Sequence, residues 1–166
     1  MVSTFHEAGK KNVRTEMIFP MNNTQPSPKS SIPIGIAIVH HENRILVGKR
    51  SAASHLAGLS EFPGGKAAPE ESLAACAIRE CFEETGLRID VDSLLHRHTH
   101  QYADRSVDLS FFLCRLHDPD GMPSPVAPFE WVSLVDLNEL TFPEGNQQVL
   151  QILQDRMRPR EVDRMA

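Results

Sequence analysis

This chain is poor in cysteine and lacks long apolar runs, and each shortage excludes a class of protein. Only three cysteines occur in 166 residues, at no spacing typical of a metal site, so we expect reduced core thiols. No stretch approaches the roughly 20 apolar residues that a membrane-spanning helix needs, and no basic head with an apolar segment opens the chain. We therefore expect a cytoplasmic protein without membrane contact. The cysteines are Cys76, Cys81 and Cys114.

Positive charge is also scarce. The formal net charge is −5, the isoelectric point is near 5.9, and lysine and arginine form no cluster. Tight binding to duplex nucleic acid depends on neutralising many phosphates, so this balance argues against such a partner. A phosphorylated small molecule is a more suitable partner, because a bound metal ion can bridge its negative phosphates and the acidic protein. We expect a monomer or a homodimer.

The length of 166 residues predicts one folded domain with an N-terminal extension. Residues 1–31 include the segment MNNTQPSPKSS, which is rich in Pro, Ser and Asn and has no apolar period. Such a composition is typical of a disordered or loosely docked segment. We assign the domain to residues 32–157 and a C-terminal tail to residues 158–166, and no internal repeat is visible.

Deletion of residues 1–30 should leave the melting temperature and the turnover of the protein almost unchanged, because this segment has little apolar surface to bury. Thermal melting and activity of the full and shortened chains check this expectation. A melting temperature lower by about ten degrees would show that the segment docks as structure.

The apolar pattern of residues 32–157 predicts an α/β order with a mixed sheet. Strands and helices alternate, with turn signals at residues 41–44, 103–105 and 118–128. Residues 51–61 are expected to form a loop. Strands are predicted at 32–40, 45–48, 88–92, 94–102, 107–116 and 129–132, and helices at 69–86 and 146–157.

The segment GKAAPEESLAACAIRECFEETGL, residues 65–87, carries most of the chemistry. Pro69 can open a helix because its missing N–H has no intrahelical partner there, and Gly86 is a natural residue to end it. At about 100° per residue, the carboxylates of Glu80, Glu83 and Glu84 share one helix face. The neighbouring stripe predicted to face the core comprises Ala74, Ala77, Ile78 and Cys81.

Three adjacent carboxylates repel one another, so a purely structural role explains them poorly. A divalent cation resolves the repulsion, and hard oxygen ligands favour Mg²⁺, with Mn²⁺ as a substitute. The competing interpretation is a solvated acidic face, which the flanking glycines and arginine disfavour.

The spacing of Gly65, Glu71, Arg79–Glu80, Glu83–Glu84 and Gly86 resembles the Nudix box, the signature of enzymes that hydrolyse a nucleoside diphosphate linked to another group. The resemblance implies a Nudix-type α/β/α sandwich with a mixed β-sheet. It also implies catalytic roles for Arg79, Glu80, Glu83 and Glu84. The implied Mg²⁺ ligands are Glu80, Glu83, Glu84 and a carbonyl of Gly64 or Gly65, with Arg79 restraining the glutamates and Glu80 as the base.

Three further stretches are similar to the MutT-like branch of this family: KRSAASHLAGLSEFPGGK, YADRSVDLSFFL and FEWVSLVDLNELTFPEGNQQVL. This resemblance implies a small nucleotide as substrate, a nucleoside triphosphate cleaved to its monophosphate and pyrophosphate, with 8-oxo-dGTP preferred. Arg50 and His55 would contact phosphates or sugar, and Phe62 the substrate. Asn146 would recognise the oxidised purine, since an amide offers both a donor and an acceptor, or would only cap the last helix.

One departure from that pattern leaves the catalytic base open. The proline-rich loop at residues 121–128 has no glutamate where this branch can supply a further metal ligand; Glu130 belongs to a predicted strand, and Glu144 is another possible donor. The alternative substrates are ADP-ribose, dinucleoside polyphosphates and capped RNA, although Gln101 replaces the proline that marks ADP-ribose hydrolases. A third alternative is a module that binds nucleotide without catalysis, which an intact set of glutamates disfavours.

One histidine pattern permits two interpretations. His96, His98 and His100 alternate, so on a strand they share one face and could hold zinc. With no cysteine or carboxylate in the pattern, we favour a polar strand face.

Overall fold

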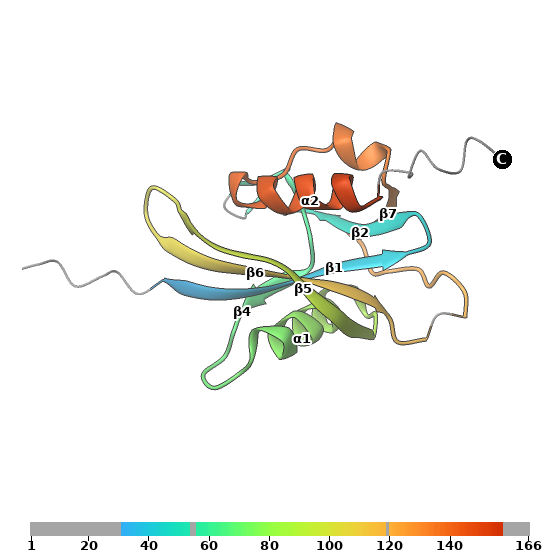
Figure 1. Ribbon diagram of the computed structural model, residues 1–166, viewed down its shortest axis with the longest axis horizontal. Helices are drawn as coiled ribbons and strands as arrows, with labels where there is room; N and C mark the ends of the chain where they lie inside the picture. The colour runs from blue at the N-terminus through green and yellow to red at the C-terminus, as the bar shows by residue number, and fades with distance from the viewer. Residues whose placement is uncertain (1–30, 54–55, 119, 158–166) are drawn as a thin grey trace, which may run out of the picture.

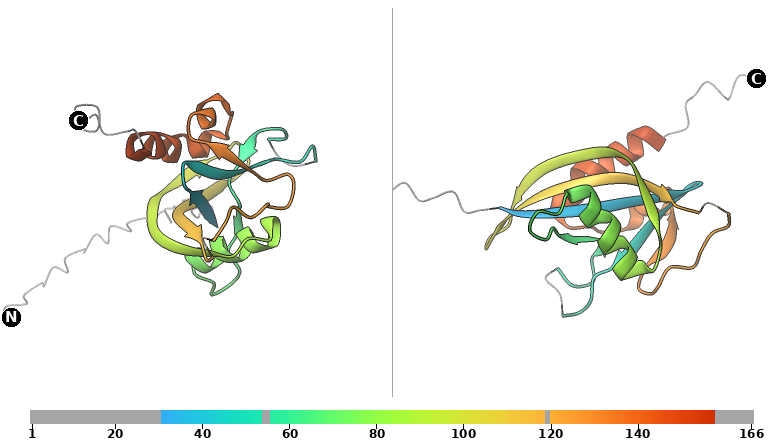
Figure 2. Two further views of the ribbon diagram at one scale, coloured as in Figure 1. Left: turned by 90° about the vertical axis from the view of Figure 1, so that its right-hand side faces the viewer. Right: turned by 90° about the horizontal axis from the view of Figure 1, so that it is seen from below.

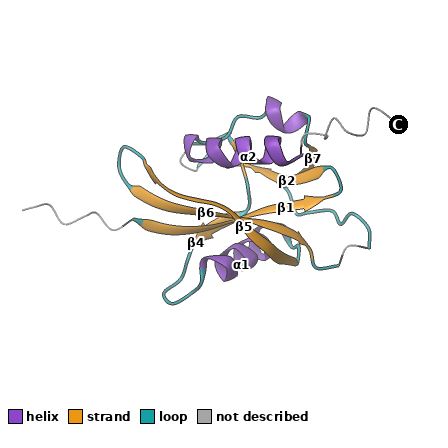
Figure 3. Ribbon diagram, in the orientation of Figure 1, coloured by secondary structure: helices purple, strands orange, loops and turns teal. Residues whose placement is uncertain are grey.

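The computed structural model describes residues 31–53, 56–118 and 120–157. They form one mixed sheet with a helix on each face, which confirms the predicted α/β/α sandwich (Figure 1). Strand β1 (Ile32–His41) runs parallel to β6 (Ser106–Leu116), and every other pairing of the sheet is antiparallel. Figure 3 shows the two helices on opposite sides of the strands.

The strand order is β3-β2-β1-β6-β5, with β4 paired to β1 and β7 paired to β2. The long strands β1, β6 and β5 are neighbours, with β5 at one end of this order, and the short strands lie on the side of β1 and β2. The remaining strands are β2 (Arg44–Lys49), β3 (Ser60–Glu61), β4 (Gly64–Lys66), β5 (Ile89–Gln101) and β7 (Glu130–Ser133).

Helix α1 (Leu73–Thr85) covers one face of the sheet and α2 (Gln147–Met157) covers the other (Figures 1 and 2). Two short 3₁₀ helices, η1 (Asp136–Glu139) and η2 (Glu144–Asn146), precede α2. None of the helices that the structure describes is both long and apolar enough to cross a membrane.

Alternation along β1 divides the core into two layers. Ile36 and Ile38 point toward α2, while Ala37 and Val39 point toward α1, as the two-residue period of a strand dictates. All four are buried because each face of the sheet carries a helix. The three cysteines are free and buried, which confirms the prediction of core thiols.

Small residues bring α1 unusually close to the sheet. A Cβ on Gly35 would lie 2.3 Å from the backbone oxygen of Leu73 and 3.0 Å from the nitrogen of Ala77. The buried side chains that face each other here, Ala37 and Ala77, are equally small. The helix is therefore held directly over β1 and its partner β4, which sets the distance between the helical carboxylates and the glycines of β4.

The first helix begins later than predicted. Pro69 lies outside it, in a turn whose next residue, Glu70, has a φ of 65°. The helix begins at Leu73 because the Ser72 hydroxyl accepts a hydrogen bond from Ala75 N at 3.2 Å, a serine cap that outweighs the proline signal. The predicted end at Gly86 is confirmed, with φ 73° in the left-handed region.

Replacement of Ser72 with alanine should destabilise the protein by about 1 kcal/mol, because it leaves a helical N–H without its cap. The matched change Pro69→Ala lies outside the helix and should cost less. Urea unfolding of both variants measures the difference, and equal losses would contradict this assignment of the helix start.

Three other expectations need correction. The predicted strands 88–92 and 94–102 form a single strand, β5, whose register shifts between Val91 and Ser93 and again between Leu94 and His96. The predicted loop 51–61 ends in the short strand β3. Ile78, placed on the core stripe, is 38% exposed, because the buried face of α1 runs through Cys76, Ala77 and Cys81 instead.

Candidate active site

The glutamates near the end of α1 meet the glycines of β4. The Glu84 carboxylate accepts a hydrogen bond from the backbone N–H of Gly64 at 3.0 Å. The Glu80 carboxylate lies against Gly65, where a Cβ would come within 2.4 Å of its carbon. Glycine at residue 65 therefore makes room for a carboxylate, and the predicted proximity of Glu80, Glu84 and the two glycines is present in the structure.

Arg79 organises the remaining carboxylates of this segment. Its guanidinium donates to Glu71 at 2.8 and 2.9 Å, to Glu80 at 2.7 Å and to Glu83 at 3.2 Å. The hydrogen bonds from Arg79, together with one from Ala68 N, lower the pKa of the Glu71 carboxyl to about 2. Glu71 is thus ionised at any working pH and holds the guanidinium between itself and the glutamates of the helix.

Negative charge is concentrated around Glu84. Burial raises the pKa of its carboxyl to about 7, against the hydrogen bond from Gly64 N. The neighbouring carboxylates of Glu61 and Glu80 raise this pKa further, and Arg50 lowers it. An ionised Glu84 is therefore costly unless a cation approaches it.

The carboxylates of α1 have the chemistry that a hard divalent cation requires, although their side chains do not converge on one point. No three His, Cys, Asp or Glu groups among the described residues lie close enough together to hold a metal ion. Glu80 and Glu83 are engaged by Arg79, and the Glu83 side chain is 56% exposed. Mg²⁺ nevertheless binds carboxylate oxygens of this kind. A cation here would also reduce the repulsion between the negative charges around Glu84.

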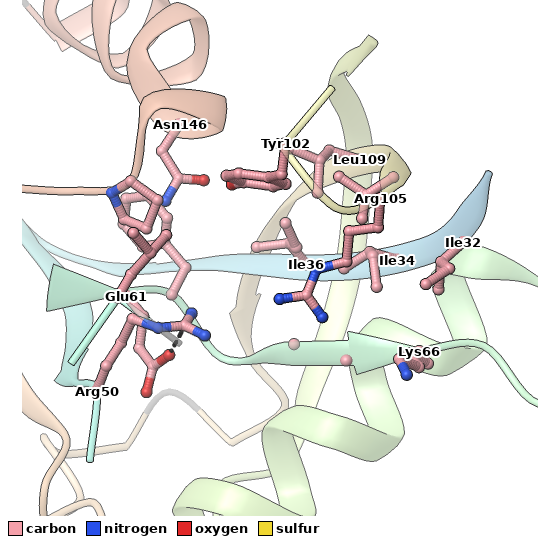
Figure 4. Close-up of a pocket in the computed structure, with 16 residues that line it drawn as sticks. Ile32, Ile34, Ile36, Arg50, Glu61, Lys66, Tyr102, Arg105, Leu109 and Asn146 are labelled. Carbon is pink, nitrogen blue, oxygen red and sulfur yellow. Dashed lines mark hydrogen bonds and ion pairs between the residues drawn. The ribbon is translucent and has the colours of Figure 1, made fainter. Parts of the chain in front are cut away.

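A cavity of about 390 Å³ opens beside β4 (Figure 4). Gly64 and Gly65, which adjoin the carboxylates of α1, form part of its wall, and so does Arg50, which is paired with Glu61 at 2.9 Å. Phe62 is 6% exposed and stacks on Phe142 at 4.8 Å, so it belongs to the core and to the cavity wall at once. The apolar wall is completed by Ile32, Ile34, Ile36, Leu56, Val107, Leu109 and Pro143.

Asn146 also lines this cavity. Its side chain projects into the cavity next to the Tyr102 ring (Figure 4), and the residue is only 8% exposed. The last helix starts one residue later than predicted, because Asn146 is the final residue of η2 and α2 begins at Gln147. No hydrogen bond of its amide to another described residue is present, so both the donor and the acceptor are available to a ligand.

Several cavity residues were not assigned from the sequence. Lys66, Tyr102 and Arg105 line the cavity, and Glu61 fixes Arg50 and acts on Glu84. Arg105 falls in a segment that the sequence marks only as a turn. His55, predicted to contact phosphates or sugar, lies outside the described residues.

The proline-rich loop contacts another part of the fold. Val126 N donates to Thr85 O at 3.0 Å, at the end of α1, and the Trp131 indole donates to Pro123 O at 2.8 Å. None of the described residues between 121 and 130 lines the cavity, and Glu130 is exposed on β7. This loop therefore adds no carboxylate to the cavity, as its sequence indicated.

The sequence of this chain is similar to the sequences of known enzymes. Residues 35–151 match the model of the NUDIX domain family. The chain is 33% identical over 120 residues to an 8-oxo-dGTP diphosphatase of Escherichia coli (strain K12), covering 72% of this chain and 93% of that protein. It is 35% identical over 89 residues to a CTP pyrophosphohydrolase of the same strain, covering 54% and 63% respectively.

A similar fold is found among solved structures. The solution structure of MutT, a Nudix hydrolase of methicillin-resistant Staphylococcus aureus 252, superposes with a TM-score of 0.63 at 27% identity. The superposition covers 78% of this chain and 99% of that one. This chain therefore shares its overall fold with a solved Nudix hydrolase.

Proposed function

This chain belongs to the Nudix family and is a Nudix hydrolase, and from that premise we propose that it is a Mg²⁺-dependent nucleoside triphosphate pyrophosphohydrolase. The reaction adds water to a nucleoside triphosphate and releases the monophosphate and pyrophosphate. The proposed preferred substrate is an oxidised purine nucleotide, 8-oxo-dGTP. The relatives at 33% and 35% identity, an 8-oxo-dGTP diphosphatase and a CTP pyrophosphohydrolase, support this class of substrate.

The observation that carries the proposal is the continuity of one cavity from Gly64 and Gly65 to Asn146. A nucleotide has phosphates at one end and a base at the other. The cavity is lined by Arg50, Lys66 and the two glycines that adjoin the carboxylates of α1, and also by the amide of Asn146. Its volume of about 390 Å³ is in the range of small-ligand pockets. We therefore place the phosphates at β4 and the base at η2.

The proposed ligands of Mg²⁺ are Glu80, Glu83, Glu84 and a carbonyl of Gly64 or Gly65. When bound, a divalent cation supplies charge neutralisation of pyrophosphate oxygens and acidifies water. Arg79 keeps the glutamates on one side of α1 through the bonds described above. Glu80 is our choice for the base that takes a proton from the attacking water, since it adjoins both Gly65 and Arg79.

The residues around the cavity then bind and orient the substrate. Arg50, fixed by Glu61, contacts phosphates, and Phe62 with the isoleucines of β1 provides the apolar surface on which a base lies. Oxidation at C8 turns the N7 acceptor of guanine into a donor. The Asn146 amide can accept from that donor with its oxygen, which gives a physical basis for preferring the oxidised base.

A release assay over a panel of nucleotides tests the reaction class. We expect dNTP substrates with Mg²⁺ to yield monophosphate and pyrophosphate in equal amounts, and chelation of the metal to stop the reaction. The panel includes CTP, ADP-ribose, a dinucleoside tetraphosphate and capped RNA. Faster hydrolysis of any of the last three than of every triphosphate would replace the proposed substrate while leaving the family assignment intact.

A further inference from the structure

A row of histidines on β5 has no part in the reaction proposed above. The rings of His96 and His98 lie 4.9 Å apart and those of His98 and His100 lie 6.3 Å apart. Tyr102 continues the row, with its ring edge to face on His100 at 4.5 Å. We name these four residues the histidine ladder. Its last member, Tyr102, also lines the nucleotide cavity.

The ladder supports the main chain that carries Asn146. The backbone of Gly145 hydrogen-bonds to the His98 ring and to the Tyr102 hydroxyl. A Cβ on Gly145 would lie 2.7 Å from Leu109 Cδ1, 3.2 Å from that hydroxyl and 3.5 Å from His100 Cγ, so the glycine packs on Leu109 and on the ladder. Because Asn146 follows at once, the position of its amide depends on where the ladder holds Gly145.

The structure is compatible only with a neutral ladder at its centre. Nδ1 of His98 and Nε2 of His100 are buried and have no hydrogen-bond partner among the described residues. An unprotonated ring nitrogen can be buried without a partner at modest cost. Protonation would turn it into a buried N–H donor without an acceptor and would also place a charge on the ring. Burial lowers the pKa of His98, and His96 and His100 lower it further, against the hydrogen bond that the ring donates to the Gly145 backbone.

The groups that face His98 from other elements do not compensate a charge on it. The Phe111 ring of β6 stacks at 6.1 Å, and Gln148 of α2 bonds to His96 at 2.6 Å and is uncharged. From η2 the backbone of Gly145 faces His98, and the charge of Glu144 acts on Tyr102. A charge on His98 is therefore opposed by His96 and His100 and balanced by none of these groups.

We propose that His98 and His100 are positioning residues for recognition of the nucleobase: their neutral rings, packed edge to face, hold Gly145 and thereby place the Asn146 amide in the cavity. Protonation of the ladder displaces this support and weakens binding of the base, while the phosphate end of the cavity is unaffected. The inference rests on the proposed function, because it requires a nucleotide base at η2.

Calorimetric binding of 8-oxo-dGMP tests the inference, with inorganic pyrophosphate as the probe that lacks a base. Between about pH 8 and pH 4.5, a range that extends below the ordinary histidine pKa because burial lowers the pKa of His98, the dissociation constant of the nucleotide should rise about tenfold more than that of pyrophosphate, the change that one unit of coupled pKa produces. His98→Phe keeps a ring but cannot ionise, so this additional loss should disappear. Comparison with this variant also removes the contribution of the nucleotide's own phosphate, which titrates in the same range.

Two more variants separate positioning from folding. His96→Gln removes a charge that lowers the pKa of His98, so the loss of affinity should begin at higher pH than in the wild type. His117→Asn changes an exposed histidine that pairs with Asp90, far from Gly145 along the sheet, and should behave as the wild type. A purely structural role of the ladder would produce no such shift.

The possible results are distinct. If nucleotide and pyrophosphate respond alike to pH, or if His98→Phe retains the additional loss, the ladder does not position Asn146. Should His98→Phe melt early, His98→Leu, which also cannot ionise, replaces it and His96→Gln still applies. A wild type that binds pyrophosphate but no purine nucleotide at any pH overturns the proposed function, and this inference with it.

Discussion

Replacement of Glu84 with glutamine should lower kcat by at least about a hundredfold, equivalent to roughly 2.7 kcal/mol of transition-state stabilisation. Glutamine keeps the shape of the side chain and can still accept the hydrogen bond from Gly64 N. What it lacks is the negative charge of a proposed Mg²⁺ ligand. Steady-state turnover at saturating Mg²⁺ measures the effect, and Glu70→Gln, an exposed change just before the helix, is the matched control.

Thermal melting shows whether this loss reflects catalysis or folding. Burial raises the pKa of the Glu84 carboxyl to about 7, so its ionised form opposes folding at neutral pH, and a neutral glutamine avoids this cost. The metal-free variant should melt no lower than the wild type. It should also lose the increase in melting temperature that Mg²⁺ gives the wild type, since a ligand stabilises only the state that binds it. Near-normal turnover in the variant would remove Glu84 from the metal site.

Replacement of Asn146 with alanine should reduce the preference for 8-oxo-dGTP over dGTP at least about tenfold. A lost pair of hydrogen bonds in a pocket closed to water costs on the order of 2 to 4 kcal/mol, and only the oxidised base uses both groups of the amide. The substitution leaves the carboxylates of α1 and the Arg50–Glu61 pair unchanged, so kcat with dGTP should change little. The ratio of the two kcat/KM values gives the result.

A role of Asn146 only as a helix cap makes a different prediction. The melting temperature would then fall by the equivalent of about 1 kcal/mol, with the substrate ratio unchanged. Measuring both quantities on the same variant separates the two roles. The exposed neighbour Gln147, changed to alanine, serves as the matched control because it lies outside the cavity.

Much of the fold follows from periodicity that the sequence makes visible. The β-branched run of β1 and the alternation of Ile36, Ala37, Ile38 and Val39 predict a strand covered on both faces. The helix end at Gly86 follows from its freedom to adopt positive φ. Helix starts are less certain, because a serine cap and a proline compete within four residues and the sequence does not say which one prevails.

The carboxylate cluster was also predictable, because all of its members lie on one helix with fixed spacing. Glu61 and Arg105 were not, since each reaches the cavity through pairing of strands or turns that are distant in sequence. The same limit applies to the histidine ladder. Alternation placed His96, His98 and His100 on one face, but only the tertiary fold brings Gly145 against it.

The most direct measurement of the central claim is the ratio of kcat/KM for 8-oxo-dGTP to that for dGTP, determined on the wild-type protein with Mg²⁺ and with the products identified. We predict a ratio of at least about ten, the discrimination that one well-placed polar contact supplies, with monophosphate and pyrophosphate as products of both substrates. Equal values for the two nucleotides, or a preference for the unmodified one, would contradict the proposed specificity and leave only the general chemistry of the family.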